Sequence, residues 1–325
     1  MQPPVAHFPF GQNGEVLHLR LIVPTPLVTE VLEELTATTG VVHVVHYSCA
    51  VTRPSGELVS CDVVREAAND VVESLQRRGL HHDGAITLDR LETVVSDAAA
   101  AAERVTPGAG GDALVWEELE GRARDDAALT ASFLVFMGIA AAIAAIGILL
   151  DSAILVIGAM VVGPDYGPLA AMCVGLVRRR WSPVFEAART MAIGVVAAAC
   201  AAFAVIAALR LATVAPEQYV SDRILTSFIS RPDAFAVVVA VLAGVVGMLS
   251  LTEGRSGALI GVLVSVTTIP AIGNIGAAAA YGQWPDAGGA AVQLIVNVTA
   301  LVVAGSITLI VQARQTTRRL RPNRP

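Results

Sequence analysis

Lysine is absent from the chain, so all 22 basic side chains among its 325 residues are arginine. Charged residues of either sign are also scarce, at 15% of the chain, whereas soluble domains contain about 25%. With 54% hydrophobic residues, this balance indicates a membrane protein. The net charge is −6 and no basic run is interleaved with aromatic residues. Nucleic acid is therefore not expected as a partner, because surfaces that bind it are basic.

Cysteine motifs and metal-ligand patterns are missing as well. The four cysteines, at positions 49, 61, 173 and 200, form no CxxC pair and no Cys/His spacing of the kind that holds zinc. We therefore predict free thiols, no metal and no cofactor; a disulfide between Cys49 and Cys61 across a hairpin is the less favoured alternative. The N-terminal residues lack the basic and apolar segments of a signal peptide, so none is expected.

Charge is spread unevenly, and this divides the chain into regions. Residues 1–128 hold all six histidines and most acidic residues, whereas long apolar runs begin at residue 129. We predict a cytosolic domain over residues 1–97, a linker with an amphipathic lead-in helix over 98–128, a transmembrane domain over 129–313 and a basic cytosolic tail over 314–325. Alternatively, the helix within the linker packs on the N-terminal domain.

The N-terminal domain has the sequence pattern of an α+β fold. Alternating apolar residues predict strands over 16–23, 41–52, 57–64 and 86–95, and apolar residues at helical spacing predict helices over 25–38 and 66–78. The order βαββαβ is typical of a ferredoxin-like domain, which binds small ligands or mediates oligomerisation in many proteins, although fold alone gives no function. The sequence shows no nucleophile–base set and no phosphate-binding glycine loop in this domain, so we predict that the protein is not an enzyme.

Six segments are long and apolar enough to cross a bilayer. They are residues 129–150, 152–177, 184–211, 234–251, 256–281 and 288–311. Arginines follow the second, fourth and sixth segments, at Arg178–Arg180, Arg255 and Arg314–Arg324. Because positive loops face the cytoplasm, these ends and both termini are predicted to be cytoplasmic. Orientation explains the arginines of the tail, and binding of anionic lipid is the alternative.

The second and fifth of these segments are interrupted by helix-breaking residues. Gly163-Pro164-Asp165-Tyr166-Gly167-Pro168 breaks the second, and Thr267-Thr268-Ile269-Pro270 breaks the fifth. A straight helix would place Asp165 near the middle of the bilayer, where a lipid-facing charge costs about 2.5–3.5 kcal/mol. Irregular backbone at that depth requires protein or cavity water around it. We therefore expect Asp165 to face the protein interior or a water-filled pocket.

These interruptions define the predicted site for a substrate or ion. It contains Asp165 as proton carrier or cation ligand, together with Gly163, Pro164, Tyr166, Gly167, Pro168, Thr267, Thr268, Pro270, Asn274 and Asn297. Two halves of three helices, each with a broken middle helix, suggest a 3+3 inverted repeat, which in transporters places the site between the repeats. The alternative is that both breaks are kinks that help helices pack through small residues.

Three stretches of the apolar region resemble a known family. IGAMVVGPDYGPLAA at 157–171, SGALIGVLVSVTTIPAIGNIG at 256–276 and QLIVNVTALVVAG at 293–305 are similar to bacterial membrane proteins catalogued as domain of unknown function 389, and the likeness covers about residues 129–310. It implies an integral protein of the bacterial plasma membrane with a cytosolic N-terminal domain. It implies no substrate.

The chain departs from that family's pattern at two places. Asp165 and Tyr166 stand where the family usually has an apolar pair, and Ile269-Pro270 stands where it often has two prolines. A charge-carrying role for Asp165 would therefore belong to a subgroup of the family.

Together these observations predict a transporter or channel for a small solute or ion, with a cytosolic domain that senses a ligand or assembles protomers. Its expected partners are the lipid bilayer, further copies of itself in a homo-oligomer, and a small-molecule or ion ligand. The alternative is a membrane-anchored sensor or scaffold whose cytosolic domain binds a small metabolite.

Overall fold

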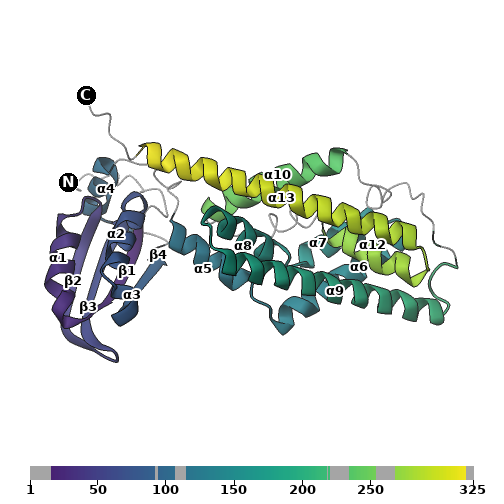
Figure 1. Ribbon diagram of the computed structural model, residues 1–325, viewed down its shortest axis with the longest axis horizontal. Coiled ribbons are helices and arrows are strands. Elements are labelled where there is room, and N and C mark those ends of the chain that lie inside the picture. Colours follow the sequence, from purple (N-terminus) through teal and green to yellow (C-terminus); the bar gives the residue numbers. More distant parts are fainter. Residues whose placement is uncertain are drawn as a thin grey trace, which may run out of the picture. The chain divides into compact units, whose positions relative to one another are not determined.

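The structure is a computed structural model that describes residues 16–91, 94–106, 115–217, 219, 234–253 and 268–319 (Figure 1). The chain divides into two compact units. The first contains Met1–Glu118 and Gln312–Pro325, and the second contains Leu119–Val311.

A four-stranded sheet forms the centre of the first unit. Its strands are β1 (Val16–Val23), β2 (Val41–Thr52), β3 (Ser55–Val64) and β4 (Ala85–Arg90). They lie in the order β2-β3-β1-β4, and every neighbouring pair is antiparallel. The predicted bounds of β1 and β2 are confirmed, whereas β4 ends at Arg90 and not at residue 95.

Two helices cover one face of this sheet. They are α1 (Val28–Ala37), which follows the 3-10 turn η1 (Thr25–Leu27), and α2 (Arg65–Arg77). Their apolar side chains pack against the inward-facing leucines of β1 in one buried core. The short helix α3 (Leu80–Asp83) was not predicted, and α4 (Asp97–Val105) packs on this core through Ala102. The elements otherwise follow one another in the order that the sequence indicates.

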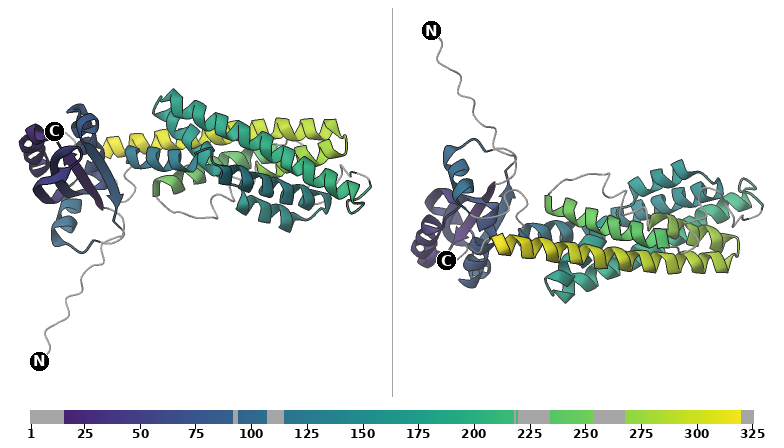
Figure 2. Two further views of the ribbon diagram at one scale, coloured as in Figure 1. Left: turned by 90° about the horizontal axis from the view of Figure 1, so that it is seen from below. Right: turned by 90° about the horizontal axis from the view of Figure 1, so that it is seen from above.

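The second unit is helical. Its elements are α5 (Trp116–Asp126, which begins in the first unit), α6 (Ala131–Leu149), α7 (Ala153–Val162), α8 (Tyr166–Val177), α9 (Trp181–Leu211), α10 (Ala234–Glu253), α12 (Ile269–Ala280) and α13 (Trp284–Arg319). Figure 2 shows the long helices of this unit running side by side along one axis. A turn at Asp151, with a φ of 47°, joins α6 and α7 into a tight helical hairpin.

Four of these helices are long and apolar enough to cross a membrane: α6, α9, α10 and α13. The pair α7 and α8 passes the same test only as a bent span, with 58° between its halves. Helix α12 is a shorter apolar helix, and the part of the fifth predicted span before Thr268 lies outside the described residues. The structure therefore contains four or five candidate spans within its described part, and the sixth stays a prediction.

Helix α12 lies at the centre of the apolar core. A Cβ atom on Gly273 would lie 2.8 Å from the Cβ of Ala144 in α6, and one on Gly276 would lie 2.6 Å from the backbone oxygen of Ala199 in α9. These glycines therefore let α12 approach both neighbours closely, as small residues do in membrane helix packing. The result is a buried helix whose first residues carry the second break in the apolar sequence.

Candidate functional site

The two interruptions in the apolar sequence meet in the structure. Asp165 and Thr268 are both 0% exposed, and the Thr268 hydroxyl donates a hydrogen bond to a carboxylate oxygen of Asp165. Close by, a Cβ on Gly163 would lie 2.7 Å from the side chain of Ile269. Asp165 thus faces the protein interior, as expected, and its partner comes from the other half of the helical region.

Each interruption is also the start of a helix. Asp165 is the N-cap of α8 and Thr268 is the N-cap of α12. Pro168 lies in the first turn of α8 and Pro270 in the first turn of α12, where a missing N–H breaks no intrahelical hydrogen bond. The two helices therefore direct their N-terminal ends, which carry partial positive charge, toward the same carboxylate.

Tyr166 and Gly167 fix the position of this break among its neighbours. The Tyr166 hydroxyl donates to the backbone oxygen of Gly247 in α10 at 2.8 Å. A Cβ on Gly167 would lie 2.1 Å from the backbone oxygen of Asp126, so the end of α5 packs directly on the first turn of α8. Burial there, with repulsion from Asp125, raises the pKa of the Asp126 carboxyl above its ordinary value, and Arg122 partly offsets the rise.

The remaining predicted site residues have partners of their own. Asn274 is buried and accepts a hydrogen bond from the Tyr219 hydroxyl at 2.7 Å. Asn297 is buried and accepts one from Gln293, one turn earlier in α13, at 3.0 Å. Thr267 lies outside the described residues. The contacts described here thus join Gly163, Asp165 and Thr268, and they do not place Asn274 or Asn297 in that group.

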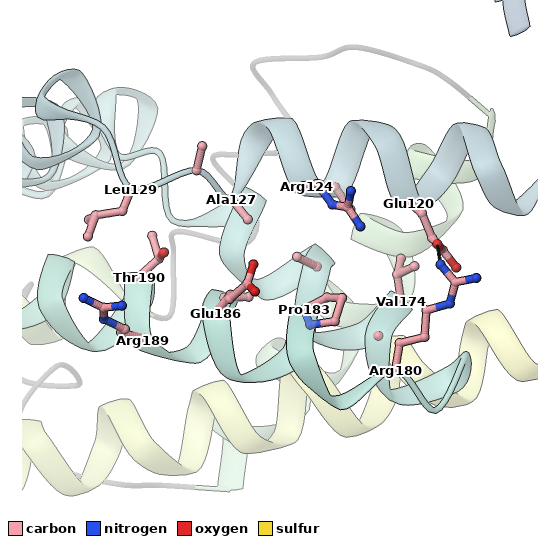
Figure 3. A pocket seen from close by; sticks show the side chains of 15 residues that line it. Glu120, Arg124, Ala127, Leu129, Val174, Arg180, Pro183, Glu186, Arg189 and Thr190 are labelled. Carbon is pink, nitrogen blue, oxygen red and sulfur yellow. Dashed lines mark hydrogen bonds and ion pairs between the residues drawn. The ribbon is translucent and has the colours of Figure 1, made fainter. Parts of the chain in front are cut away.

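A pocket that the sequence did not predict lies between α5, α8 and α9, and all of its lining residues belong to the second unit (Figure 3). Its volume is about 330 Å³. Apolar lining comes from Ala127, Leu129, Ala171, Val174 and Pro183. Charged side chains line it as well: Glu120 and Arg124 from α5, Arg180 between α8 and α9, and Glu186 and Arg189 from α9.

The charges around this pocket are only partly paired. Glu120 accepts from the Arg178 Nε at 2.7 Å and from the Arg180 guanidinium at 2.5 Å. Within the described part of the chain, Arg124 and Arg189 form no ion pair. The arginines of positions 178–180 were expected only to orient the chain, and no sequence pattern indicated that Glu120 binds them.

A polar cluster lies on the sheet of the first unit, on the face opposite α1 and α2. The two carboxylate oxygens of Asp62 contact Nδ1 of His18 at 2.8 Å and Nδ1 of His43 at 2.7 Å. The His43 Nε2 lies 2.8 Å from the hydroxyl of Ser96, and Ser96 caps α4 by accepting from the backbone N–H of Ala99.

The hydroxyl of Ser96, the imidazole of His43 and the carboxylate of Asp62 are thus linked in the order of a nucleophile, a base and the group that orients the base. The sequence did not reveal this arrangement. A register shift between Val42 and Val45 in β2, with a φ of 51° at His43, produces this placement. Within the described residues, no group of three or more His, Cys, Asp or Glu side chains is arranged to hold a metal ion.

Comparison with known proteins gives one match. Residues 160–303, which contain Asp165, Thr268 and Asn297, match a family model described as a domain of unknown function (DUF389). No curated protein and no solved structure matches the chain. This part of the helical region is therefore assigned to the DUF389 family.

Proposed function

We propose that the protein is a membrane transporter or channel for a small solute or ion, whose site is the meeting point of the two broken helices. The observation that carries this proposal is the hydrogen bond from Thr268 to the buried carboxylate of Asp165. A carboxylate inside an apolar helical region is costly, and such groups mark ion or proton pathways in membrane proteins.

Of the two roles predicted for Asp165, that of a proton carrier fits the surroundings better. A bound metal cation needs several oxygen ligands, whereas the N-terminal ends of α8 and α12 at this side chain present backbone N–H groups. Protonation requires no further ligands and removes the negative charge in place. A proton could therefore bind and leave while the helix ends remain where they are.

The proposal includes six membrane crossings arranged as a 3+3 inverted repeat, in which the bent pair α7 and α8 is the second crossing and residues 256–281 are the fifth. Its support is that the breaks in these two crossings touch each other, as expected for middle helices of related halves. Both termini would lie in the cytoplasm of a bacterial cell, with residues 1–97 as the cytosolic domain, 98–128 as the linker and 314–325 as the tail.

For the N-terminal domain we propose a ferredoxin-like fold that assembles protomers. The strand order β2-β3-β1-β4, with α1 and α2 on one face, supports the fold. The other face carries exposed apolar side chains at Val45, which is 40% exposed, and Tyr47, which is 54% exposed. Exposed apolar side chains of this kind support a homo-oligomer.

The transport proposal is tested by proton flux into proteoliposomes that contain a pH-sensitive dye, driven by a potassium diffusion potential. We expect flux through the wild-type protein, and loss of that flux in Asp165→Asn. Asp151→Asn is the matched control, because it removes one carboxylate from the same helical hairpin at a position whose positive φ asparagine tolerates. Equal flux through Asp165→Asn and Asp151→Asn would remove Asp165 from the mechanism.

The alternative function, a membrane-anchored sensor whose cytosolic domain binds a metabolite, is favoured by the cluster of His18, His43 and Asp62 on the open face of the sheet. For this function we expect no flux in the wild-type protein. We also expect a metabolite from a screening panel to raise the melting temperature, and Asp62→Asn to abolish that shift.

A further inference from the structure

We propose that the pocket between α5, α8 and α9 binds an anionic phospholipid, with its phosphate at Arg124, Arg189 adding positive charge farther along the pocket, and the start of an acyl chain against the apolar wall. This proposal requires that the helical region lies in a membrane. It does not depend on the transport function proposed above.

The size and lining of the pocket fit an amphiphile. Its volume of about 330 Å³ lies within the range of small-molecule sites, about 300–1,000 Å³. Ala127, Ala171 and Val174 provide an apolar wall. Figure 3 shows Arg124 and Arg189 on two helices along the pocket, with Glu186 between them. A second hollow of about 550 Å³ adjoins it and shares Arg124 and Arg180. The two spaces together offer room for a charged headgroup beside a hydrocarbon chain.

The charge of the pocket selects an anion. Glu120 is already bound by Arg178 and Arg180, and Glu186 accepts a hydrogen bond from Ser182 at 3.1 Å. Arg124 and Arg189 are exposed and, among the residues that the structure describes, have no carboxylate partner. The lining holds three arginines and two glutamates, so it carries one positive charge in excess, and guanidinium groups bind phosphate oxygens in a bidentate manner.

The position of the pocket along α9 points to a membrane lipid as the source of that phosphate. Thr190 is the last residue of α9 that lines the pocket, and residues 191–209, which follow it in the helix, carry no charge. On the first turns of the same helix, Trp181 is 60% exposed and Phe185 is 69% exposed. Exposed aromatic side chains next to an apolar helix are typical of the membrane interface. The pocket would thus lie at the level of lipid headgroups.

The test is native mass spectrometry of the full-length protein with phosphatidylglycerol and phosphatidylcholine of the same acyl chains. We expect phosphatidylglycerol to be retained preferentially. Near an anionic lipid surface each arginine contributes roughly a fivefold gain in affinity, so the double variant Arg124→Gln/Arg189→Gln should bind phosphatidylglycerol about 25-fold more weakly. The control variant Arg179→Gln/Arg314→Gln removes the same charge from arginines outside the pocket and should bind as the wild type does.

Two further measurements separate a lipid from a free phosphate. Ala127→Phe fills the apolar wall without changing charge and should also weaken phosphatidylglycerol binding, whereas inorganic phosphate should not displace the lipid. Displacement by inorganic phosphate, with no effect of Ala127→Phe, would show a free-phosphate site and overturn the proposal. An equal loss of phosphatidylglycerol binding in the pocket double variant and in the control double variant would overturn the proposal too. If the pocket double variant fails to fold, the proposal is decided by two other results. These are the binding of phosphatidylglycerol to Ala127→Phe and the preference of the wild-type protein between phosphatidylglycerol and phosphatidylcholine.

Discussion

The contact between Gly167 and Asp126 gives the sharpest test of the helical packing around the site. Gly167 lies two residues after Asp165, and a Cβ at this position would lie 2.1 Å from the backbone oxygen and 2.5 Å from the backbone carbon of Asp126. Backbone atoms cannot rotate away as a side chain does. Substitution Gly167→Ala must therefore push the end of α5 away from α8 or distort the first turn of α8.

The expected magnitude follows from two opposing effects. Overpacking costs about 1–3 kcal/mol, and we take the upper end because the contact is with backbone. Alanine in a helix is favoured over glycine by about 1 kcal/mol, which leaves a net loss of about 2 kcal/mol in the free energy of unfolding. For a unit of the size of Leu119–Val311, that loss lowers the midpoint of thermal unfolding by roughly 4–8 °C.

The assay is thermal unfolding of the detergent-solubilised protein, followed by circular dichroism. Gly158→Ala is the matched control, because Gly158 lies in α7 and a Cβ there would meet nothing within 4 Å. The control should be slightly more stable than the wild type, by about 0.5–1 kcal/mol. A Gly167→Ala protein that is as stable as the Gly158→Ala protein would refute the packing of α5 on α8.

Charge, capping and thiol accessibility give three further tests. Burial raises the pKa of Asp126 above its ordinary value of 3.8. The stability that this group contributes is therefore fully present below pH 3.8 and is lost as the pH rises through the raised pKa. Asp126→Asn should raise the unfolding midpoint at neutral pH and leave it unchanged at a pH of about 3. Ser96→Ala removes the cap of α4 and should lower the free energy of unfolding in denaturant by about 1 kcal/mol. A fluorophosphonate, which reacts with activated serines, should not label the wild-type protein. Labelling at Ser96 would contradict the prediction that the protein is not an enzyme. Burial raises the pKa of Cys61 to about 12, so a membrane-impermeant maleimide should modify the exposed Cys49 in opened vesicles and spare Cys61, with Cys200 unmodified if it faces lipid.

The bounds of β1 and β2 could be predicted because local chemistry marks them. Pro24 follows β1, and the backbone of Gly40, with a φ of 93°, precedes β2. The end of β4 could not be predicted in this way. Its residues pair with β1 from Ala85 to Arg90, and β4 stops where β1 begins, so its length depends on its partner in the sheet and not on its own sequence.

Part of the candidate site could be predicted from the cost of burying charge. A carboxylate within an apolar run has to face protein, and Asp165 does. The polar residue that meets it, Thr268, belonged to the predicted set because it lies at the second break. The contacts of Tyr166 with α10 and of Gly167 with α5 could not be predicted, because an apolar helix with small residues on several sides does not indicate which side meets which neighbour.

The pocket escaped prediction because its arginines have a second explanation in the sequence. Arg178 and Arg180 fit the positive-inside rule, which considers each loop alone, yet in the structure both bind Glu120, about sixty residues earlier. Partly exposed ion pairs of this kind contribute only about 0–1 kcal/mol each, so they add little to stability. Their larger effect is positional: they hold α5 beside α8 and occupy Glu120, and this leaves Arg124 and Arg189 as the charges that a ligand in the pocket would meet.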